Sequence, residues 1–245
     1  MIDIEVREFK KHDLRGGIVI DGFPNIGLVG AIFSSYLVAA KGLDQIACLD
    51  SEKFPPVSMI FDGKPKFPAR IYAGTDPKIA VFVAEFTPPP ALDRPLATRM
   101  LKWAREQEAS MIITSVTLPF LEEEEMKTDS PVLGVASTQR ARDMLAKAGI
   151  KTFDIGMITG APAVLLNEGR WNDFDVIALL VKAHPLVPDH RAAAKLIETM
   201  SRLIPNMKID VGPLYEEATK IEDRLKSIRA QALRAEGGPT EDVYK

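Results

Sequence analysis

Short apolar runs of strand length alternate with helix-like segments along most of the chain. The run "GGIVIDG" is bounded by glycines, and the segment "IGLVGAIFSSYLVAA" that follows it has apolar residues at helical spacing until Lys41-Gly42. Strands that alternate with helices predict an α/β fold, with a mostly parallel mixed sheet flanked by helices. Strand-length runs that follow one another directly between Gln45 and Glu85 predict an antiparallel portion of that sheet.

The size and composition of the chain predict one large domain. Of its 245 residues 46% are hydrophobic, which is enough to fill a substantial core. No low-complexity linker divides the sequence. We therefore expect an α/β core domain over residues 1–212, an amphipathic helix over 213–236 and a flexible tail over 237–245.

The charge pattern argues against nucleic acid and membranes as partners. The formal net charge is −3, and acidic and basic residues are mixed throughout, so no basic face is expected. No apolar run reaches the length of a transmembrane helix. Cys48 is the single cysteine, which rules out an internal disulfide and favours a reducing compartment. These features predict a cytoplasmic protein.

The segment after Gly212-Pro213 has the heptad spacing of an oligomerisation helix. Charged residues fill most of the positions between its apolar ones. A helix of this kind predicts a homo-oligomer; the alternative is a terminal amphipathic helix that packs on its own domain. The apolar stripe consists of Leu214, Ala218, Ile221, Leu225, Ile228 and Ala232.

The last residues, "GGPTEDVYK", have the composition of a flexible tether that ends in an apolar-aromatic pair. Two glycines end the preceding helix and Pro239 prevents it from resuming. Val243 and Tyr244 then stand beside the terminal carboxylate of Lys245. Capture of a C-terminal carboxylate is a recurring mode of recognition, so the tail is a candidate plug for a partner's pocket. The alternative is an ordinary frayed terminus.

The motifs that signal catalysis or cofactor binding are incomplete. "DGFPNIGLVG" resembles a phosphate-binding turn, but it fits neither the dinucleotide nor the P-loop fingerprint, and its glycines are explained by a tight turn and close helix packing. The carboxylates of Glu122 to Glu125 are consecutive and cannot converge on one metal ion. Neither a nucleophile elbow nor a zinc-binding helix motif occurs. We expect a protein without cofactors, and not an enzyme.

An ordered series of motifs resembles the proteasome assembly chaperone 2 family, in particular its archaeal members. The series reads "GFPNIGLVG", "FPPVSMIFDGKP", "ARIYAG", "LKWAREQEASMIITSVTLP", "GVAST", "GMITGAPAVLL" and "IDVGPLYEEATKIEDRL". It covers roughly Ile18 to Leu225 and is far more specific than any single motif. One departure is Asn25, at a position where the family commonly has glycine.

The resemblance implies a fold similar to nucleoside phosphorylases and a function at the proteasome. Several members of the family end in a hydrophobic-tyrosine-any tripeptide, which in proteasome activators inserts between neighbouring α-subunits of the core particle. Val243, Tyr244 and Lys245 match that tripeptide. The resemblance thus implies an ATP-independent assembly chaperone or activator that docks on the α-ring of the core particle.

Two other classes of function remain open at this point. One is an enzyme of nucleoside phosphorylase-like fold that acts on a purine or nucleoside, with its pocket near the Gly22–Gly30 and Thr159–Gly160 turns. The other is an oligomeric scaffold with an unrelated partner. The sequence also leaves open the number of subunits, and whether the protein assists assembly or opens the gate of the finished core.

Overall fold

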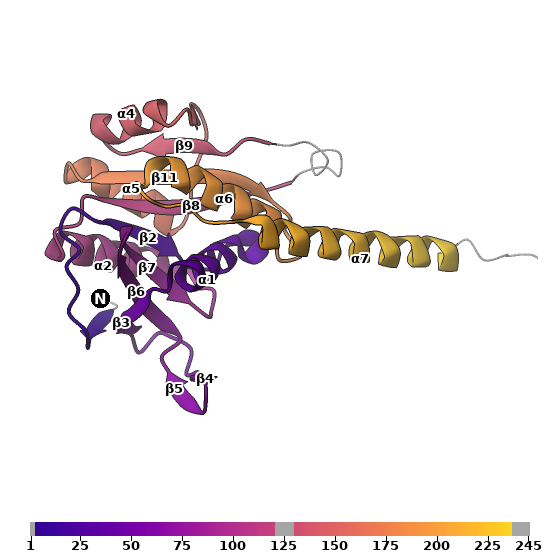
Figure 1. The fold of residues 1–245 in the computed structure, drawn as a ribbon, viewed down its shortest axis with the longest axis horizontal. Helices are drawn as coiled ribbons and strands as arrows, with labels where there is room; N and C mark the ends of the chain where they lie inside the picture. Colours follow the sequence, from indigo (N-terminus) through magenta and orange to yellow (C-terminus); the bar gives the residue numbers. More distant parts are fainter. Residues whose placement is uncertain (1–2, 121–129, 237–245) are drawn as a thin grey trace, which may run out of the picture.

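The body of the protein is a single mixed sheet with helices on both faces (Figure 1). The computed structural model describes residues 3–120 and 130–236, with the backbone alone for 225–236. The docking residues Val243, Tyr244 and Lys245 lie outside the described residues.

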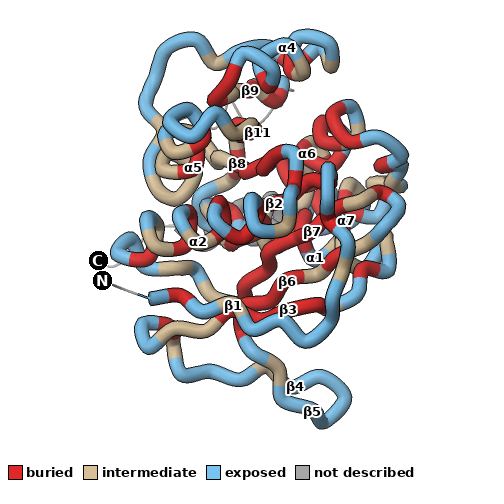
Figure 2. Tube along the Cα trace, turned by 90° about the vertical axis from the view of Figure 1, so that its left-hand side faces the viewer, coloured by how far each residue is buried: buried red, intermediate tan, exposed pale blue. Residues whose placement is uncertain are grey.

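The main sheet has nine strands in the order β1-β3-β6-β7-β2-β8-β11-β9-β10. A separate two-stranded hairpin, β4 (Met59–Phe61) and β5 (Lys64–Lys66), extends from the body and is largely exposed (Figure 2). The strands of the main sheet are β1 (Glu5–Glu8), β2 (Ile18–Gly22), β3 (Asp44–Asp50), β6 (Ala69–Thr75), β7 (Lys78–Ala84), β8 (Met111–Pro119), β9 (Leu133–Ala136), β10 (Lys151–Thr152) and β11 (Asp175–Ala183).

The mixed α/β sheet is confirmed, but its parallel portion is smaller than expected. Strands β7, β2, β8 and β11 are parallel neighbours, and β10 is parallel to β9. Strands β1, β3, β6 and β7 pair antiparallel, which confirms the antiparallel portion between Gln45 and Glu85, and β9 is antiparallel to β11. The connection from β6 to β7 is only Asp76-Pro77, far too short for the crossover that a parallel pair needs.

The helices form a layer on each face of the sheet. The strands supply apolar side chains to both layers: Ile18 and Ile20 of β2 lie in one core cluster, while Val19 lies in the other. The first layer contains α1 (Val29–Lys41), α4 (Gln139–Lys147), α6 (His190–Leu203) and the start of α7 (Gly212–Glu236). The second contains α2 (Asp93–Glu106) and α5 (Ala161–Trp171).

The predicted unit of strand, turn and helix at the N-terminus is confirmed. A single 3-10 turn, η1 (Ile26–Leu28), joins β2 to α1, and a second, η2 (Pro90–Leu92), precedes α2. Helix α1 ends at Lys41 and is followed by Gly42, whose φ of 57° is left-handed, as the lysine-glycine pair in the sequence predicted. A side chain at Gly22 would lie 2.2 Å from Ser34 Cβ, so this glycine lets α1 pack closely on β2.

The parallel strands β7, β2, β8 and β11 all end at one edge of the sheet, which we call the carboxyl edge. The η1 turn follows β2 there, and the segment 184–189 leads from β11 to α6 at the same edge. Loops at the carboxyl ends of parallel strands are the usual place for binding residues in α/β proteins. The candidate sites described below are grouped around this edge.

Candidate partner-binding arm

The first turns of α7 pack on the body of the same chain. Leu214 is 5% and Ala218 is 4% exposed, and Leu214 belongs to the core cluster that contains α6. Ile221 is half-buried. For Leu214 and Ala218 the alternative interpretation, a terminal helix that packs on its own domain, therefore describes the structure, and these two residues are covered within one subunit.

Polar contacts fix the direction of α7 along α6. Arg191 Nε and Nη2 donate to Glu222 Oε1 and Oε2 at 2.9 and 3.1 Å, and hydrogen bonding to Glu222 raises the pKa of the guanidinium. Tyr215 Oη donates to Glu198 Oε2 at 3.0 Å. Because Tyr215 lies beside Glu198 while Glu222 lies beside Arg191, the two helices are antiparallel. Helix α7 therefore runs toward the carboxyl edge, where α6 begins.

The remainder of α7, Glu222–Glu236, extends past the body, and we call it the arm (Figure 1). At 1.5 Å per residue it is about 20 Å long. Leu225, Ile228 and Ala232 of the predicted stripe lie on the arm, where the structure describes the backbone alone. Their role in oligomerisation stays a prediction, as does that of the tail that follows.

The turn between β2 and α1 is held by Asn25, where the sequence resemblance led us to expect glycine. Its φ of −138° is extended, so glycine is not required for the backbone. The side-chain amide donates to Ser115 Oγ at 3.0 Å and accepts from the Gly30 N–H at 2.8 Å. Asn25 thereby ties the turn both to strand β8 and to the first turn of α1.

A buried carboxylate lies where β2 and β8 separate at the carboxyl edge. The two strands pair from Ile18 to Ile20 and no further. Beyond that point Asp21, 6% exposed, accepts from Thr114 Oγ1 at 2.8 Å and from the Phe23 N–H at 3.2 Å. Burial raises the pKa of the Asp21 carboxyl, and the charge of Asp93 adds to the rise.

The two turns that sequence reasoning assigned to an alternative enzyme pocket both lie near this carboxylate. Asp93 Oδ2 lies 3.6 Å from the position of a Cβ added at Gly160, and the β2-η1 turn begins at Gly22. The oxygens of Asp21 already accept hydrogen bonds from this chain. No group of three or more metal-ligating side chains occurs in residues 3–120 and 130–236.

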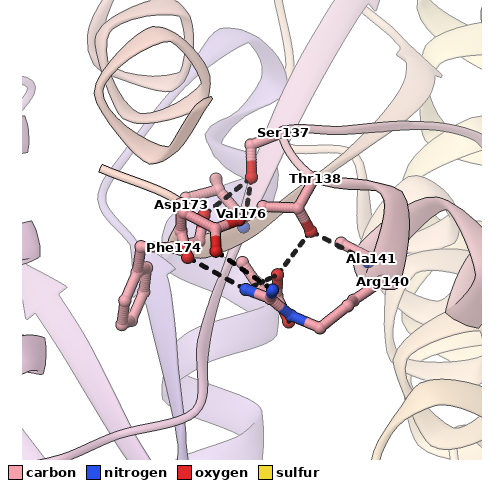
Figure 3. Close-up of polar contacts among 8 residues, drawn as sticks. Ser137, Thr138, Arg140, Ala141, Asp173, Phe174 and Val176 are labelled. Atoms are coloured by element: carbon pink, nitrogen blue, oxygen red, sulfur yellow. Dashed lines mark hydrogen bonds and ion pairs between the residues drawn. The ribbon is translucent and has the colours of Figure 1, made fainter. Parts of the chain in front are cut away.

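A second polar cluster, at the opposite edge of the sheet, has a structural role (Figure 3). Arg140 bridges Asp173 and Asp175, with its Nη1 3.2 Å from Asp173 Oδ2 and its Nη2 3.1 Å from Asp175 Oδ1. These two carboxylates raise the pKa of the guanidinium. Thr138 donates to Asp175 and accepts the Ala141 N–H at 3.1 Å, which caps α4. The cluster attaches α4 to the start of β11.

Ser137, next to Thr138 in the "GVAST" motif, completes this attachment. Its hydroxyl donates to the Phe174 carbonyl and accepts the Val176 N–H, both at 2.8 Å (Figure 3). The polar groups of the cluster thus bond to one another and to the backbone. This part of the motif series is explained by folding.

Sequence reasoning missed the Arg191–Glu222 contact and the role of Asn25. Glu222 is one of many charged residues on α7, and its partner lies on another helix, so no spacing along the chain connects them. Asparagine is common before helical turns, and Asn25 precedes η1, but its bond to the Gly30 N–H reaches past η1 into α1, which the usual capping spacing does not predict. None of the described helices is long and apolar enough to cross a membrane.

Comparison with known proteins connects this architecture to one family. The sequence profile of the PAC2 family matches residues 19–229. An uncharacterized protein of Methanocaldococcus jannaschii is 26% identical over 93% of this chain and 91% of its own length. The crystal structure of Pyrococcus furiosus PbaA, an archaeal homolog of proteasome-assembly chaperone, superposes with a TM-score of 0.80 at 27% identity, covering 96% of this chain and 94% of PbaA.

A second solved structure has the same fold at lower identity. Pyrococcus furiosus PbaB, an archaeal proteasome activator, gives a TM-score of 0.77 at 20% identity and covers 94% of this chain and 100% of its own. The profile match begins within β2, so it leaves out β1, and it spans all later strands, both helix layers and most of α7. The chain is therefore a member of the PAC2 family.

Proposed function

We propose that this protein is an ATP-independent proteasome assembly chaperone or activator that docks on the α-ring of the core particle through Val243, Tyr244 and Lys245. Membership in the PAC2 family and likeness to an archaeal homolog of proteasome-assembly chaperone support a role at the proteasome. The main structural support for the proposal is the position of the arm. Helix α7 leaves the body at the carboxyl edge, and in the sequence the tail follows directly after the last residue of α7.

Each residue of the tripeptide has a distinct role in the proposed contact. Val243 fills an apolar cleft, and Tyr244 is the amphipathic anchor whose ring is buried while its hydroxyl keeps a hydrogen-bond partner. The terminal carboxylate of Lys245 pairs with a basic group of the partner's pocket. The Lys245 side chain itself contributes little, because any residue serves at the last position of such a tripeptide.

The dimensions of the arm and tail suit a ring-shaped partner. The arm is about 20 Å long, and the nine residues from Gly237 extend it by at most roughly 30 Å. In a homo-oligomer joined through Leu225, Ile228 and Ala232, several tails reach separate pockets. Linked tails raise the effective concentration for the second contact to about millimolar, so an oligomer binds far more tightly than one tail peptide.

The proposal is tested by surface plasmon resonance, which measures the binding of the untagged, full-length protein to the archaeal-type core particle. Tyr244→Ala should abolish binding, because it removes the anchor, while Lys245→Arg should bind like wild type. A Tyr244→Ala variant that binds as tightly as wild type would refute tail-mediated docking. Gate opening by the same samples, followed with a fluorogenic peptide, separates an activator from a chaperone that acts only during assembly.

A second candidate function is an enzyme that acts on a purine or nucleoside, and the buried Asp21 favours it. A carboxyl group with a raised pKa at the carboxyl ends of parallel strands is a frequent feature of active sites. Purines and nucleosides would then raise the melting temperature of the wild-type protein. The shift should be absent in Asp21→Asn; a shift that is equal in both proteins, or absent in both, would count against this candidate.

A further inference from the structure

Met157 is the most exposed sulfur-containing side chain in the described part of the chain. It is 81% exposed, and Ile155, two residues before it, is 92% exposed. Two other methionines, Met59 and Met144, are half-buried. The remaining described methionines are at most 4% exposed: Met100, Met111, Met200 and Met207. Solvent therefore reaches the Met157 thioether far more readily than it reaches these other six.

The loop between β10 and α5, residues 153–160, is held at both ends. At its start the Phe153 N–H donates to the Gly134 carbonyl of β9 at 3.0 Å. At its end the Ala161 N–H donates to the carboxylate of Asp93, the first residue of α2. The loop is thus attached to the body on both sides of its exposed segment.

Inside the loop, the ring of Phe153 packs directly on the backbone at Gly156. A Cβ added at Gly156 would lie 2.1 Å from Phe153 Cζ and 2.5 Å from Cε1, so a larger residue would displace the ring. Phe153 is half-buried, whereas Ile155 and Met157, on either side of Gly156, are exposed. The ring contact fixes the middle of the loop and leaves the two apolar side chains beside it in solvent.

The single thiol of the chain is a poor competitor for an oxidant. Cys48 lies in β3 and is 4% exposed. Burial raises the pKa of its thiol, which disfavours the reactive thiolate at neutral pH. Oxidation of sulfur side chains follows exposure and, for cysteine, thiolate character. A thioether needs no deprotonation, so the exposure of Met157 is sufficient for it to react.

We propose that Met157 is a reversible oxidation site, with hydrogen peroxide as the oxidant. The thioether sulfur attacks one peroxide oxygen and the O–O bond breaks. The hydroxide that leaves takes the proton of the transferred oxygen and forms water, so the sulfur is oxidised to the sulfoxide as the peroxide is reduced. Methionine sulfoxide reductases reverse the change. In that direction a dithiol is oxidised to a disulfide and the sulfoxide oxygen leaves as water.

Oxidation at this position changes the surface and leaves the fold intact. The sulfoxide is polar, whereas the thioether is apolar. Because Met157 is 81% exposed, the added oxygen meets solvent and displaces no packed side chain, so stability should be unchanged. The exposed apolar pair of Ile155 and Met157 becomes partly polar. The site goes beyond docking on the core particle, because neither the arm nor the tail belongs to this loop.

The first test is peptide mapping by mass spectrometry after treatment of the full-length protein with dilute hydrogen peroxide. Met157 should gain one oxygen atom at a rate similar to that of a methionine in a short peptide. The four buried methionines should react slower by about tenfold or more, because they are accessible only when the fold opens. A Met157 that reacts no faster than the buried methionines would overturn the proposal.

The second test is retention on a hydrophobic-interaction column. Peroxide-treated wild type should elute earlier than untreated wild type, and so should untreated Met157→Gln, in which a polar side chain of similar length replaces the thioether. Met157→Leu keeps an apolar side chain without sulfur, so its elution should not change with peroxide. Met59→Leu is the matched control and should respond to peroxide as wild type does. The melting temperatures of all these samples should be equal.

The reversal is measured on the same column. Incubation of the oxidised wild type with a methionine sulfoxide reductase and a dithiol should restore the original elution and remove the oxygen from Met157. An elution that stays early after this treatment would overturn reversibility. A peroxide-induced shift that is as large in Met157→Leu as in wild type would overturn Met157 as the residue that changes the surface.

Discussion

Arg191 at the start of α6 and Glu222 on α7 are joined by two parallel contacts of 2.9 and 3.1 Å, and this pair sets the direction in which the arm leaves the body. Both side chains are partly exposed, at 40% and 44%. A pair of this kind has a modest effect on stability, and it joins the start of the arm to the start of α6.

A double-mutant cycle measures the strength of this pair. Arg191→Met and Glu222→Gln, singly and together, should give a coupling of about 0.2–1 kcal/mol in urea unfolding at low salt, because the contact is solvent-exposed. The coupling should fall toward zero in 1 M salt, where charges are screened beyond about 3 Å. A coupling that is independent of salt would show that packing, not charge, orients α7.

The burial of Leu214 predicts that the start of α7 is part of the core. Leu214→Ala should lower the free energy of unfolding by about 2–4 kcal/mol, since it leaves a cavity next to α6. Leu186→Ala is the control, because Leu186 is 86% exposed and should change stability by less than about 0.5 kcal/mol. Equal effects of the two changes would contradict the packing of α7 on α6.

The raised pKa of Asp21 predicts a dependence of stability on pH. The folded protein holds the Asp21 proton to higher pH than the unfolded chain does, so stability should decline as pH rises from about 3.9 through the folded pKa. Asp21→Asn should remove this decline, measured as the free energy of unfolding from pH 4 to 8.

Asp13 is a control for Asp21, because its pKa is shifted in the opposite direction and its contribution to stability should depend on pH in the opposite way. The Arg15 N–H and the Lys78 ammonium lower the pKa of the exposed Asp13 carboxyl. Asp13 therefore stabilises the protein at pH values above the pKa that its carboxyl has in the unfolded chain. This contribution is lost as pH falls through the lower pKa that the carboxyl has in the folded protein. Asp13→Asn should reduce the loss of stability in acid. A decline with rising pH that is identical in wild type and Asp21→Asn would contradict the account of Asp21.

Asn25 predicts a graded series of variants. Asn25→Ala removes the hydrogen bonds to both Ser115 and Gly30. It should lower the free energy of unfolding by about 1–2 kcal/mol, an amount similar to the loss of a side chain that bonds the N–H groups of a first helical turn. Asn25→Asp keeps the acceptor for the Gly30 N–H and should cost less. Thermal unfolding of the two variants measures the difference; an Asn25→Ala variant as stable as wild type would show that the turn is held by other contacts.

The sequence predicted the parts of the fold that depend on local spacing. The β2-α1 unit, its end at Gly42 and the antiparallel strands after Gln45 follow from periodicity and glycine placement. The extent of the parallel portion could not be predicted in this way, because strand order and direction depend on long-range pairing. For example, β11 lies between β8 and β9, parallel to the first and antiparallel to the second. A mostly parallel sheet was expected from the alternation of strands and helices alone.

The candidate site was less accessible to sequence reasoning than the fold. Heptad spacing is the same whether a helix packs on its own domain or on a partner, so the sequence did not separate Leu214 and Ala218, which the body covers, from the rest of the stripe. The left-handed backbone of Leu28 belongs to a turn whose Gly27 carbonyl accepts the Asp189 N–H, and no spacing along the chain reveals that long-range contact. The roles of Val243, Tyr244 and Lys245, outside the described residues, stay predictions.

The most direct test of the central claim is core-particle binding by a variant with one residue added after Lys245. The addition moves the terminal carboxylate by about 3.5 Å and leaves Val243, Tyr244 and the arm unchanged. If the carboxylate is part of the recognised group, the extended protein should not bind the core particle in surface plasmon resonance, and neither should Tyr244→Ala. The mass and melting temperature of the extended protein should equal those of wild type. An extended protein that binds like wild type would contradict docking through the C-terminal tripeptide.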